Sequence, residues 1–201
     1  MWAVALLSSY FLGAIPTGYL LVRLTSHVDI RTVGSGNIGA TNALRTAGPW
    51  VGATVLIGDM LKGVIAAAVI PQLFLHAADP LRSLVCGAAA VIGHDFPCFL
   101  RFQGGKGVAT TLGALLGTAQ PLAGVVLGVW LITFAVSRYV SVGSLAAALA
   151  IPITQMFLHR PGLEVCLGAL LGGLMIARHH ANIQRLLRGA EHRAWSRHPS
   201  Q

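Results

Sequence analysis

The amino-acid sequence predicts an all-α integral membrane protein, a single domain over residues 1–201 with seven transmembrane helices, an outside N-terminus and a cytoplasmic C-terminus. Hydrophobic residues make up 55% of the chain and charged residues only 10%, and the mean hydropathy is +0.71. The apolar stretches are long enough to cross a hydrocarbon core. This composition excludes a water-soluble enzyme, a disordered chain and a disulfide-rich secreted module.

Six apolar runs supply the transmembrane elements. They are Trp2–Val22, Val51–Leu75, Leu84–Leu100, Gly107–Ser137, Gly143–Leu158 and Leu163–Ala177. The first run follows no basic segment, which favours a spanning helix over a signal peptide. The fourth run would be roughly 46 Å long as one helix, well beyond the ~30 Å hydrocarbon core. Because proline prefers a helix start to a helix interior, we divide this run at Pro121 and expect seven helices.

The basic residues favour seven helices over six, because cytoplasmic loops are enriched in lysine and arginine. With seven helices and an outside N-terminus, only Arg82 and Arg160 lie outside. The cytoplasmic set is Arg23, Arg31, Arg45, Arg101, Lys106, Arg138, Arg178, Arg185, Arg188, Arg193 and Arg197. The shortest of the seven, Gly107–Thr118, is only roughly 18 Å long. We attribute the net charge of +8 to these loops and to anionic bilayer lipids, and not to nucleic acid.

The loop after the first helix is rich in glycine and in small polar side chains. It contains Gly34-Ser-Gly-Asn-Ile-Gly-Ala-Thr-Asn42, followed by Arg45. Its glycines match G-x-G-x-x-G, but no strand or βαβ unit surrounds them, so we exclude a dinucleotide fold. Candidate anion donors here are Ser35, Gly36, Asn37, Thr41, Asn42 and Arg45. The alternative is a flexible loop whose polar residues cap helices.

A second loop reads Gly104-Gly-Lys-Gly107 and leads directly into a helix. Free backbone N–H groups, a helix N-terminus and the Lys106 ammonium then meet at one point, which suits an anion. The run is not a Walker A loop, because its first glycine and the Ser or Thr after the lysine are missing. The alternative role for Lys106 is snorkelling to lipid phosphate. The candidates are Gly104, Gly105, Lys106, Gly107 and Thr110.

Polar residues also occur near the C-terminus and inside one helix. His179 and Asn182 are three residues apart and share a helix face. Their spacing does not suit a two-histidine metal site, and we expect no metal. Ser141 and Ser144 either receive phosphate oxygens or cap a helix. Inside the second helix, Asp59 and Lys62 must pair or face a polar site, structural or catalytic, because each charge is costly in a bilayer.

Three separated motifs together resemble the PlsY family, the bacterial acyl-phosphate-dependent glycerol-3-phosphate acyltransferases. They are Gly34–Asn42, Gly93-His-Asp-Phe-Pro97 with Gly104–Thr110, and Arg178-His-His-Ala-Asn-Ile-Gln-Arg-Leu186 followed by Gly189 and Glu191. The resemblance covers nearly the entire chain. It implies transfer of a fatty acyl group from acyl phosphate to the 1-hydroxyl of glycerol 3-phosphate, giving lysophosphatidate in the first step of phospholipid synthesis.

The resemblance also implies residue roles. The residues expected to bind glycerol 3-phosphate are Ser35, Arg45, Lys106 and His179. Those expected to hold acyl phosphate are Thr41, Asn42, Ser141, Asn182 and the Gly104–Thr110 backbone, with Ser144 and Glu191 as further substrate-binding residues. His180 follows His179, so the sequence leaves open which imidazole faces the site. Acyl phosphate carries a good leaving group, so positioning and charge neutralisation suffice and no covalent nucleophile or cofactor is expected.

The competing prediction is a membrane transporter or flippase for organic phosphates, which would also need basic and glycine-rich helix ends. No inverted repeat is visible in the sequence, and the polar loops all fall on one predicted side. A purely structural membrane protein would leave three donor-rich loops without purpose. The expected partners are acyl phosphate, glycerol 3-phosphate, bilayer lipids and the soluble enzyme that makes acyl phosphate, and the expected location is the bacterial inner membrane, with the site facing the cytoplasm.

Overall fold

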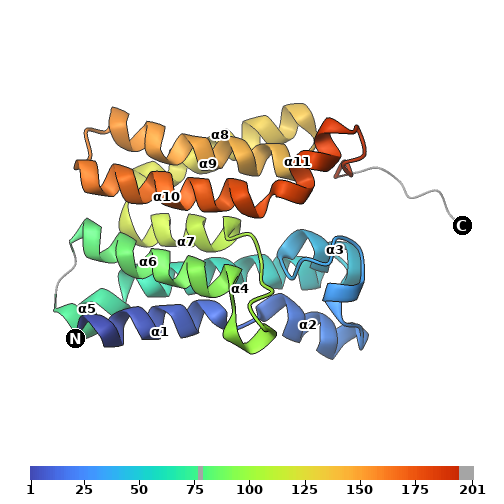
Figure 1. The fold of residues 1–201 in the computed structure, drawn as a ribbon, viewed down its shortest axis with the longest axis horizontal. Coiled ribbons are helices and arrows are strands. Elements are labelled where there is room, and N and C mark those ends of the chain that lie inside the picture. The colour runs from blue at the N-terminus through green and yellow to red at the C-terminus, as the bar shows by residue number, and fades with distance from the viewer. Residues whose placement is uncertain (77–78, 195–201) are drawn as a thin grey trace, which may run out of the picture. The chain divides into compact units, whose positions relative to one another are not determined.

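The computed structural model describes residues 1–76 and 79–194, and these residues form helices and no strand (Figure 1). The helices are α1 (Trp2–Ala14), α2 (Thr17–Ser26), α3 (Ala40–Ala47), α4 (Pro49–Ala68), α5 (Ile70–Leu75), α6 (Pro80–Asp95), α7 (Val108–Thr118), α8 (Gln120–Ser137), α9 (Val140–Phe157), α10 (Gly162–Arg178) and α11 (His180–Leu187). Two 3₁₀ turns, η1 (Ile30–Thr32) and η2 (Cys98–Leu100), lie in the loops. The all-α prediction is confirmed, whereas Arg197, counted among the cytoplasmic charges, lies outside the described residues.

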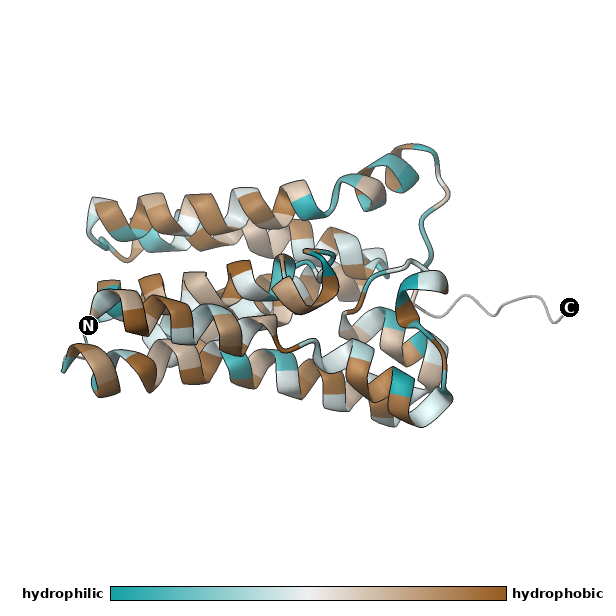
Figure 2. Cartoon of the chain, turned by 60° about the horizontal axis from the view of Figure 1, so that its bottom comes forward, coloured by the Kyte–Doolittle hydropathy of each residue, from teal (hydrophilic) through white to brown (hydrophobic). Residues whose placement is uncertain are grey.

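Five stretches in the described part of the chain are long and apolar enough to cross a membrane, and a sixth qualifies if α10 and α11, bent by 58°, form one span. Figure 2 shows hydrophobic residues along these helices and hydrophilic residues gathered in the connecting segments. The helix α7 is also apolar but has only 11 residues. A multi-pass membrane protein is therefore supported, and the count of seven stays a prediction.

The boundaries show which apolar runs are continuous. The fourth run is divided as predicted, since α7 ends at Thr118 and α8 begins at Gln120. The first run, predicted as one helix, is interrupted: α1 ends at Ala14 and α2 begins at Thr17. The break falls at Pro16, which has no N–H to donate within a helix.

The chain forms two compact units, Met1–Gln120 and Pro121–Gln201, which we call unit 1 and unit 2. The single-domain prediction stays a prediction. In unit 1, α1 and α6 run in the same direction: the Arg82 guanidinium lies 6.0 Å from the Trp2 ring centroid near their starts, and the Phe11 and Phe99 centroids lie 6.3 Å apart towards the other end.

A second parallel pair in unit 1 is α4 and α7, which pack backbone to backbone through glycines. A β-carbon on Gly113 would overlap Met60, and one on Gly117 would lie 3.0 Å from the Val64 carbonyl oxygen. The direction of α6 is opposite, since Gly87 lies against Ala114 and Gly107 against Val91. The α2–α4 and α6–α7 connections therefore emerge at the same end of unit 1.

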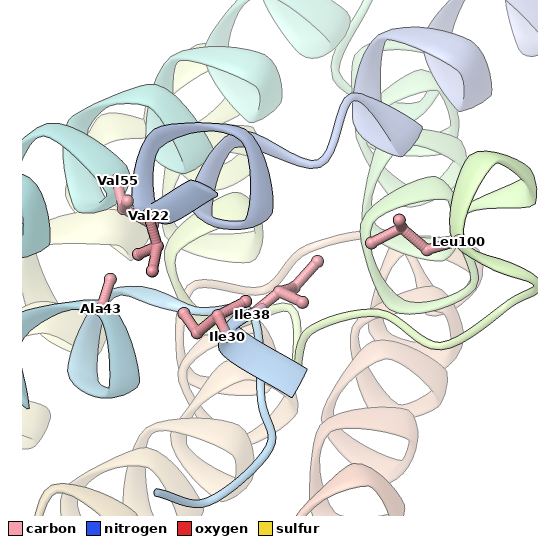
Figure 3. Packing of buried hydrophobic residues seen from close by; sticks show 6 residues of the cluster. All are labelled: Val22, Ile30, Ile38, Ala43, Val55 and Leu100. Carbon is pink, nitrogen blue, oxygen red and sulfur yellow. The ribbon is translucent and has the colours of Figure 1, made fainter. Parts of the chain in front are cut away.

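Buried side chains join these two connections. Val22, Ile30, Ile38, Ala43, Val55 and Leu100 form one cluster, each at most 6% exposed (Figure 3). Ile30 and Ile38 come from the first loop, and Leu100 comes from the second. Burial of these apolar side chains fixes both glycine-rich loops to the helices beneath them.

Unit 2 contains an antiparallel pair, α9 and α10. Gly168 lies against Gln155, and Gly172 against Ala148. The C-terminal segment returns to the α8–α9 turn, where the backbone N–H of Ala194 donates to the Arg138 carbonyl at 3.0 Å. The start of α9, α11 and the segment after it therefore lie at one end of unit 2.

Candidate functional site

In unit 1 the first loop is organised around the side chain of Asn42, which is 2% exposed. Its Oδ1 accepts from the backbone N–H of Ser35 at 3.1 Å. Its Nδ2 donates to three carbonyl oxygens, of Ile30 at 3.2 Å, Val33 at 3.1 Å and Asn37 at 3.0 Å. We call Asn42 and these four backbone groups the Asn42 hub. One amide thus connects both sides of the loop. The Asn42 side chain, which was predicted to hold acyl phosphate, instead makes its hydrogen bonds within the protein.

The loop glycines meet a backbone requirement. Gly34 and Gly36 have φ of 59° and 68°, in the left-handed region that favours glycine. A β-carbon on Gly34 would also overlap Oδ1 of Asn42. Gly36 donates its backbone N–H to the Val33 carbonyl at 3.0 Å. These two glycines are explained by the turn itself.

The other predicted donors of this loop differ in exposure. Ser35 and Arg45 are exposed and Thr41 is half-buried. Asn37 forms a turn ahead of α3, since its Oδ1 accepts from the backbone N–H of Gly39, the N-cap residue, at 2.9 Å. Asn37 is therefore used within the loop, whereas Ser35 and Arg45 are exposed at its surface, and their role as anion donors stays a prediction.

An ion pair stabilises the start of the loop. Arg31 Nη2 lies 2.6 Å from Asp29 Oδ2, and the guanidinium carbon lies 5.0 Å from the centroid of the Tyr19 ring. Hydrogen bonds from Arg31 lower the pKa of Asp29 from 3.8 to about 2. The same pairing raises the pKa of Arg31. Arg31 is therefore committed to Asp29, whereas Arg45 is the exposed cation of the loop.

The second loop turns around His94 and Asp95. Gly105 donates its backbone N–H to the His94 carbonyl at 3.0 Å. A β-carbon on Gly104 would overlap that same carbonyl, and one on Gly105 would overlap the His94 imidazole. The glycine pair is required by close packing within the protein, and the Gly105 N–H predicted for acyl phosphate is used in the turn.

Helix α7 begins where the glycine turn ends. Gly107 has a φ of 72° and is the N-cap residue. Asp95 is fully buried, and its Oδ1 would lie 3.1 Å from a β-carbon on Gly107. Lys106 is half-buried, and Thr110 is fully buried against α4. Lys106 and the N-terminus of α7 thus occur together, as predicted, and the Asp95 carboxylate lies next to Gly107.

In unit 2 the C-terminal candidates meet at one carboxylate. Asn182 Nδ2 donates to Glu191 Oε1 at 2.7 Å, and Arg185 Nε donates to Glu191 Oε2 at 2.7 Å. We call Asn182, Arg185 and Glu191 the Glu191 clasp. Burial raises the pKa of Glu191, but hydrogen bonds from Asn182 and Arg185 hold it below its ordinary value. Glu191 therefore anchors the segment after α11 as an ionised group.

The two adjacent histidines are clearly distinguished. His179 is 3% exposed, and its Nδ1 lies 2.7 Å from the Met175 carbonyl oxygen. His180 is exposed, and its Nδ1 lies 3.1 Å from the Ala177 carbonyl oxygen. Because a carbonyl can only accept, Nδ1 of His179 carries a proton and Nε2 is the basic nitrogen of the neutral ring. His179 is the candidate side chain.

The serines at the start of α9 are both buried. Ser144 accepts from Trp130 Nε1 at 3.3 Å and donates to the Val140 carbonyl at 2.9 Å. Ser141 is 4% exposed and lies in the first turn of α9. Ser144 is thus held within unit 2, and its proposed contact with substrate is untested.

Sequence reasoning gave His94 no separate role, although it contacts both the buried ion pair and the glycine turn. Asp59 and Lys62 form the predicted ion pair, 2.7 Å apart, and both are buried. The His94 Nδ1 lies 3.4 Å from the Lys62 Nζ. The available signal was a histidine at the end of a membrane helix, ahead of the glycine pair it contacts. In residues 1–76 and 79–194, no group of three or more His, Cys, Asp or Glu side chains could hold a metal ion.

The fold and these loops define an integral membrane protein that presents glycine-rich turns, exposed cations and a buried imidazole at helix ends. The sequence model of the family "Glycerol-3-phosphate acyltransferase" matches residues 3–189. The chain belongs to this family, and the acyltransferase prediction is confirmed over the transporter alternative.

Similar proteins cover nearly the whole chain. Glycerol-3-phosphate acyltransferase of Brucella anthropi is 45% identical over 93% of this chain and 90% of its own length. That of Syntrophotalea carbinolica is 47% identical over 94% and 96%. The crystal structure of PlsY (YgiH), an integral membrane glycerol 3-phosphate acyltransferase, in its glycerol 3-phosphate form has a TM-score of 0.88 at 38% identity, covering 95% of this chain and 94% of that one. Its lysophosphatidic acid form gives 0.85 at 37% identity, with the same coverage.

Proposed function

We propose that this protein transfers a fatty acyl group from acyl phosphate to the 1-hydroxyl of glycerol 3-phosphate, releasing lysophosphatidate and phosphate. The observation that carries the proposal is family membership over residues 3–189. The names of the two PlsY crystal forms, with glycerol 3-phosphate and with lysophosphatidic acid, support the acceptor and the product. The acyl phosphate donor follows from the resemblance to the PlsY family.

The proposed glycerol 3-phosphate ligands are Ser35, Arg45, Lys106 and His179. The proposed acyl phosphate ligands are Thr41, Asn42, Ser141, Asn182 and backbone groups of Gly104–Thr110. Contacts within the protein refine two of these roles, since the Asn42 hub and the Gly105 turn use their polar groups internally. We propose that Asn42 and Gly105 position the neighbouring donors, and that Arg45 and Lys106 neutralise the phosphates.

The proposed chemistry is direct attack. The glycerol 1-hydroxyl oxygen bonds to the acyl carbon while the bond from that carbon to the phosphate oxygen breaks, and inorganic phosphate leaves. The hydroxyl proton passes to His179 Nε2 or to a phosphate oxygen of a substrate. The hydrogen bond from His179 Nδ1 to Met175 favours the imidazole, because it fixes the tautomer with a basic Nε2. A pH–rate profile that loses its acidic limb in His179→Gln would assign the proton to His179.

We further propose seven membrane crossings, an outside N-terminus and a cytoplasmic C-terminus, in the bacterial inner membrane. Support comes from the basic residues, eleven against two on the predicted sides. The parallel pairs α1 with α6 and α4 with α7 also fit, since alternate crossings run in the same direction. The site then faces the cytoplasm, where the soluble enzyme that makes acyl phosphate is the proposed partner.

The test is ester formation by the purified full-length protein supplied with acyl phosphate and radiolabelled glycerol 3-phosphate. We expect Lys106→Gln to lower the rate by at least about 100-fold, because one phosphate loses its counter-charge. Arg101→Gln is the matched control, an exposed cation in the same loop, and it should stay within about threefold. Uptake of glycerol 3-phosphate into vesicles without ester formation would instead support a transporter. Covalent trapping of an acyl group on Ser35 or Ser141 would contradict direct attack.

A further inference from the structure

We infer that Asp59, Lys62 and His94 form a positioning cluster, which fixes the conformation of the Gly104–Gly105 turn from inside unit 1. The cluster thereby sets the affinity for the anionic acyl donor. The cluster does not provide a ligand to the substrate. The inference rests on the proposed function in one respect, since this turn is proposed to hold acyl phosphate. It adds residues from α4 and α6 to the machinery, and the two from α4, Asp59 and Lys62, are remote in sequence from the turn.

The cluster is a compact buried charge network. Lys62 Nζ lies 2.7 Å from Asp59 Oδ1. His94 Nδ1 lies 3.4 Å from Lys62 Nζ and 3.6 Å from Asp59 Oδ1. The three residues are 2%, 5% and 4% exposed. Bulk water therefore screens these charges little, and their mutual geometry is strongly determined.

Lys62 also connects this network to the break in the first membrane helix. Its ammonium donates to the carbonyls of Ile15 at 2.8 Å and Gly13 at 3.3 Å. Helix α1 ends beside these residues because Pro16 follows, and carbonyls at a helix end need partners from elsewhere. One side chain on α4 thus fixes the α1–α2 break and reaches α6 through His94.

His94 extends the network to the turn by two routes. Its carbonyl accepts the backbone N–H of Gly105 at 3.0 Å. The Nε2 side of its imidazole occupies the space where a β-carbon on Gly105 would lie. The ring is therefore in contact with Lys62 on its Nδ1 side and with the turn on its Nε2 side. A shift of the ring must move the turn or open a gap beneath it.

Stability alone is a weak explanation for this cluster. A buried ion pair is often no more stabilising than well-packed apolar residues of similar volume, because both charges lose hydration. Apolar side chains here could fill the space but could not hold the imidazole by directional contacts on one side. Because the His94 ring contacts the turn, we attribute to the charges the role of fixing the position of the ring, and not of adding buried surface.

The experiment is a double-mutant cycle between Gly105 and His94 in the full chain, measured by steady-state kinetics with acyl phosphate. Gly105→Ala should raise KM for acyl phosphate by at least about tenfold and change kcat by less than about threefold, because its methyl group displaces the ring. In His94→Ala the ring is gone, so adding Gly105→Ala should raise KM by no more than about twofold further. His94→Asn is the second background. Its shorter side chain vacates the space beside Gly105 and retains a polar group towards Lys62.

A structural control separates positioning from general destabilisation. Gly168→Ala inserts a methyl group between α10 and α9 in unit 2, where it overlaps Gln155. It should lower the melting temperature while leaving KM for acyl phosphate within about twofold. If Gly105→Ala raises KM equally in the wild-type and in both His94 backgrounds, the inference is wrong.

Failure of the proposed function gives a different result. If the wild-type protein forms no ester from acyl phosphate, the donor assignment fails. The inference is then tested by amide hydrogen exchange over residues 104–108, which should become at least about tenfold faster in His94→Asn while exchange in α9 is unchanged. Unchanged exchange over 104–108 would overturn the cluster's role in holding the turn.

Discussion

The Asn42 hub in unit 1 and the Glu191 clasp in unit 2 fix polar segments with opposite chemistry. The hub uses a neutral amide that satisfies four backbone groups of one loop. The clasp uses an ionised carboxylate that receives two side-chain donors from α11. A neutral hub adds no charge beside a turn that is proposed to bind anions, whereas a carboxylate adds a negative charge and a dependence on pH.

The largest expected effect is the loss of the neutral hub. Asn42→Ala leaves the Ser35 N–H and three carbonyls without their amide partner, at a cost of about 1 kcal/mol or more for each lost bond. We expect kcat/KM for ester formation to fall by at least about 100-fold, because Ser35 loses its position. Asn42→Asp keeps the acceptor for Ser35 but places a buried carboxylate oxygen against three carbonyl oxygens, so its loss should be at least as large. Near-wild-type kinetics in Asn42→Ala would contradict a role of the hub in positioning Ser35.

The second prediction concerns the imidazole next to the clasp. His179→Ala should lower kcat/KM by at least about tenfold, since a buried, oriented imidazole is removed. His180→Ala should change it by less than about twofold, because that ring is exposed. Ester-formation kinetics of the two variants, prepared in parallel, settle which histidine belongs to the site. A larger loss in His180→Ala would reverse the assignment.

A smaller effect is expected for removing the charge of the clasp. Glu191→Gln keeps an oxygen that can accept from Asn182 but weakens the charge-assisted bond from Arg185. The expected loss is about 1–2 kcal/mol of local stability, because hydrogen bonds between charged groups exceed neutral ones by roughly this amount. Hydrogen exchange of the segment after α11 measures it, and Arg188→Gln is the matched control that lies outside the clasp. Equal exchange in wild type and Glu191→Gln would show that the charge is dispensable.

The smallest effect is a difference in acid sensitivity. The pKa values of Glu191 and Asp29 are both below their ordinary values of 4.5 and 3.8. Each carboxylate therefore stabilises the fold above its ordinary pKa, and the contribution is lost as pH falls through the folded value. The clasp should begin to open below about pH 4.5, whereas the Asp29–Arg31 pair persists towards about pH 2. Protection factors over 182–194 should stay constant above about pH 4.5 and fall below it, whereas those over the hub should stay constant down to about pH 3.8. A parallel fall in both regions would contradict this sign.

Much of the fold was predictable because apolar runs and prolines act locally. The division before Pro121 follows from the length of one run and the helix-start preference of proline. The same rule explains the break at Pro16, which the predicted first helix ignored. The short helix α3 was not predicted, since it has no apolar run and depends on tertiary contacts.

The candidate residues were predictable by type and less so by role. Glycine, serine and asparagine indicate a turn with donors, but nothing local determines whether the Asn42 amide faces a ligand or its own loop. His94 was missed for a related reason, because its partner Lys62 is 32 residues away in the sequence. Directional contacts between distant segments cannot be read from periodicity or spacing.

The depth of the glycine turn has a consequence for how a fatty substrate reaches the enzyme. The turn packs on His94, whose neighbour Asp59 lies roughly 15 Å along α4 from Pro49. Pulling a hydrocarbon tail out of lipid into water costs about 0.8 kcal/mol per methylene, on the order of 10 kcal/mol for a sixteen-carbon tail. A reaction at the proposed site beside this turn avoids that extraction, since the tail stays dissolved in the bilayer and only the head group has to move.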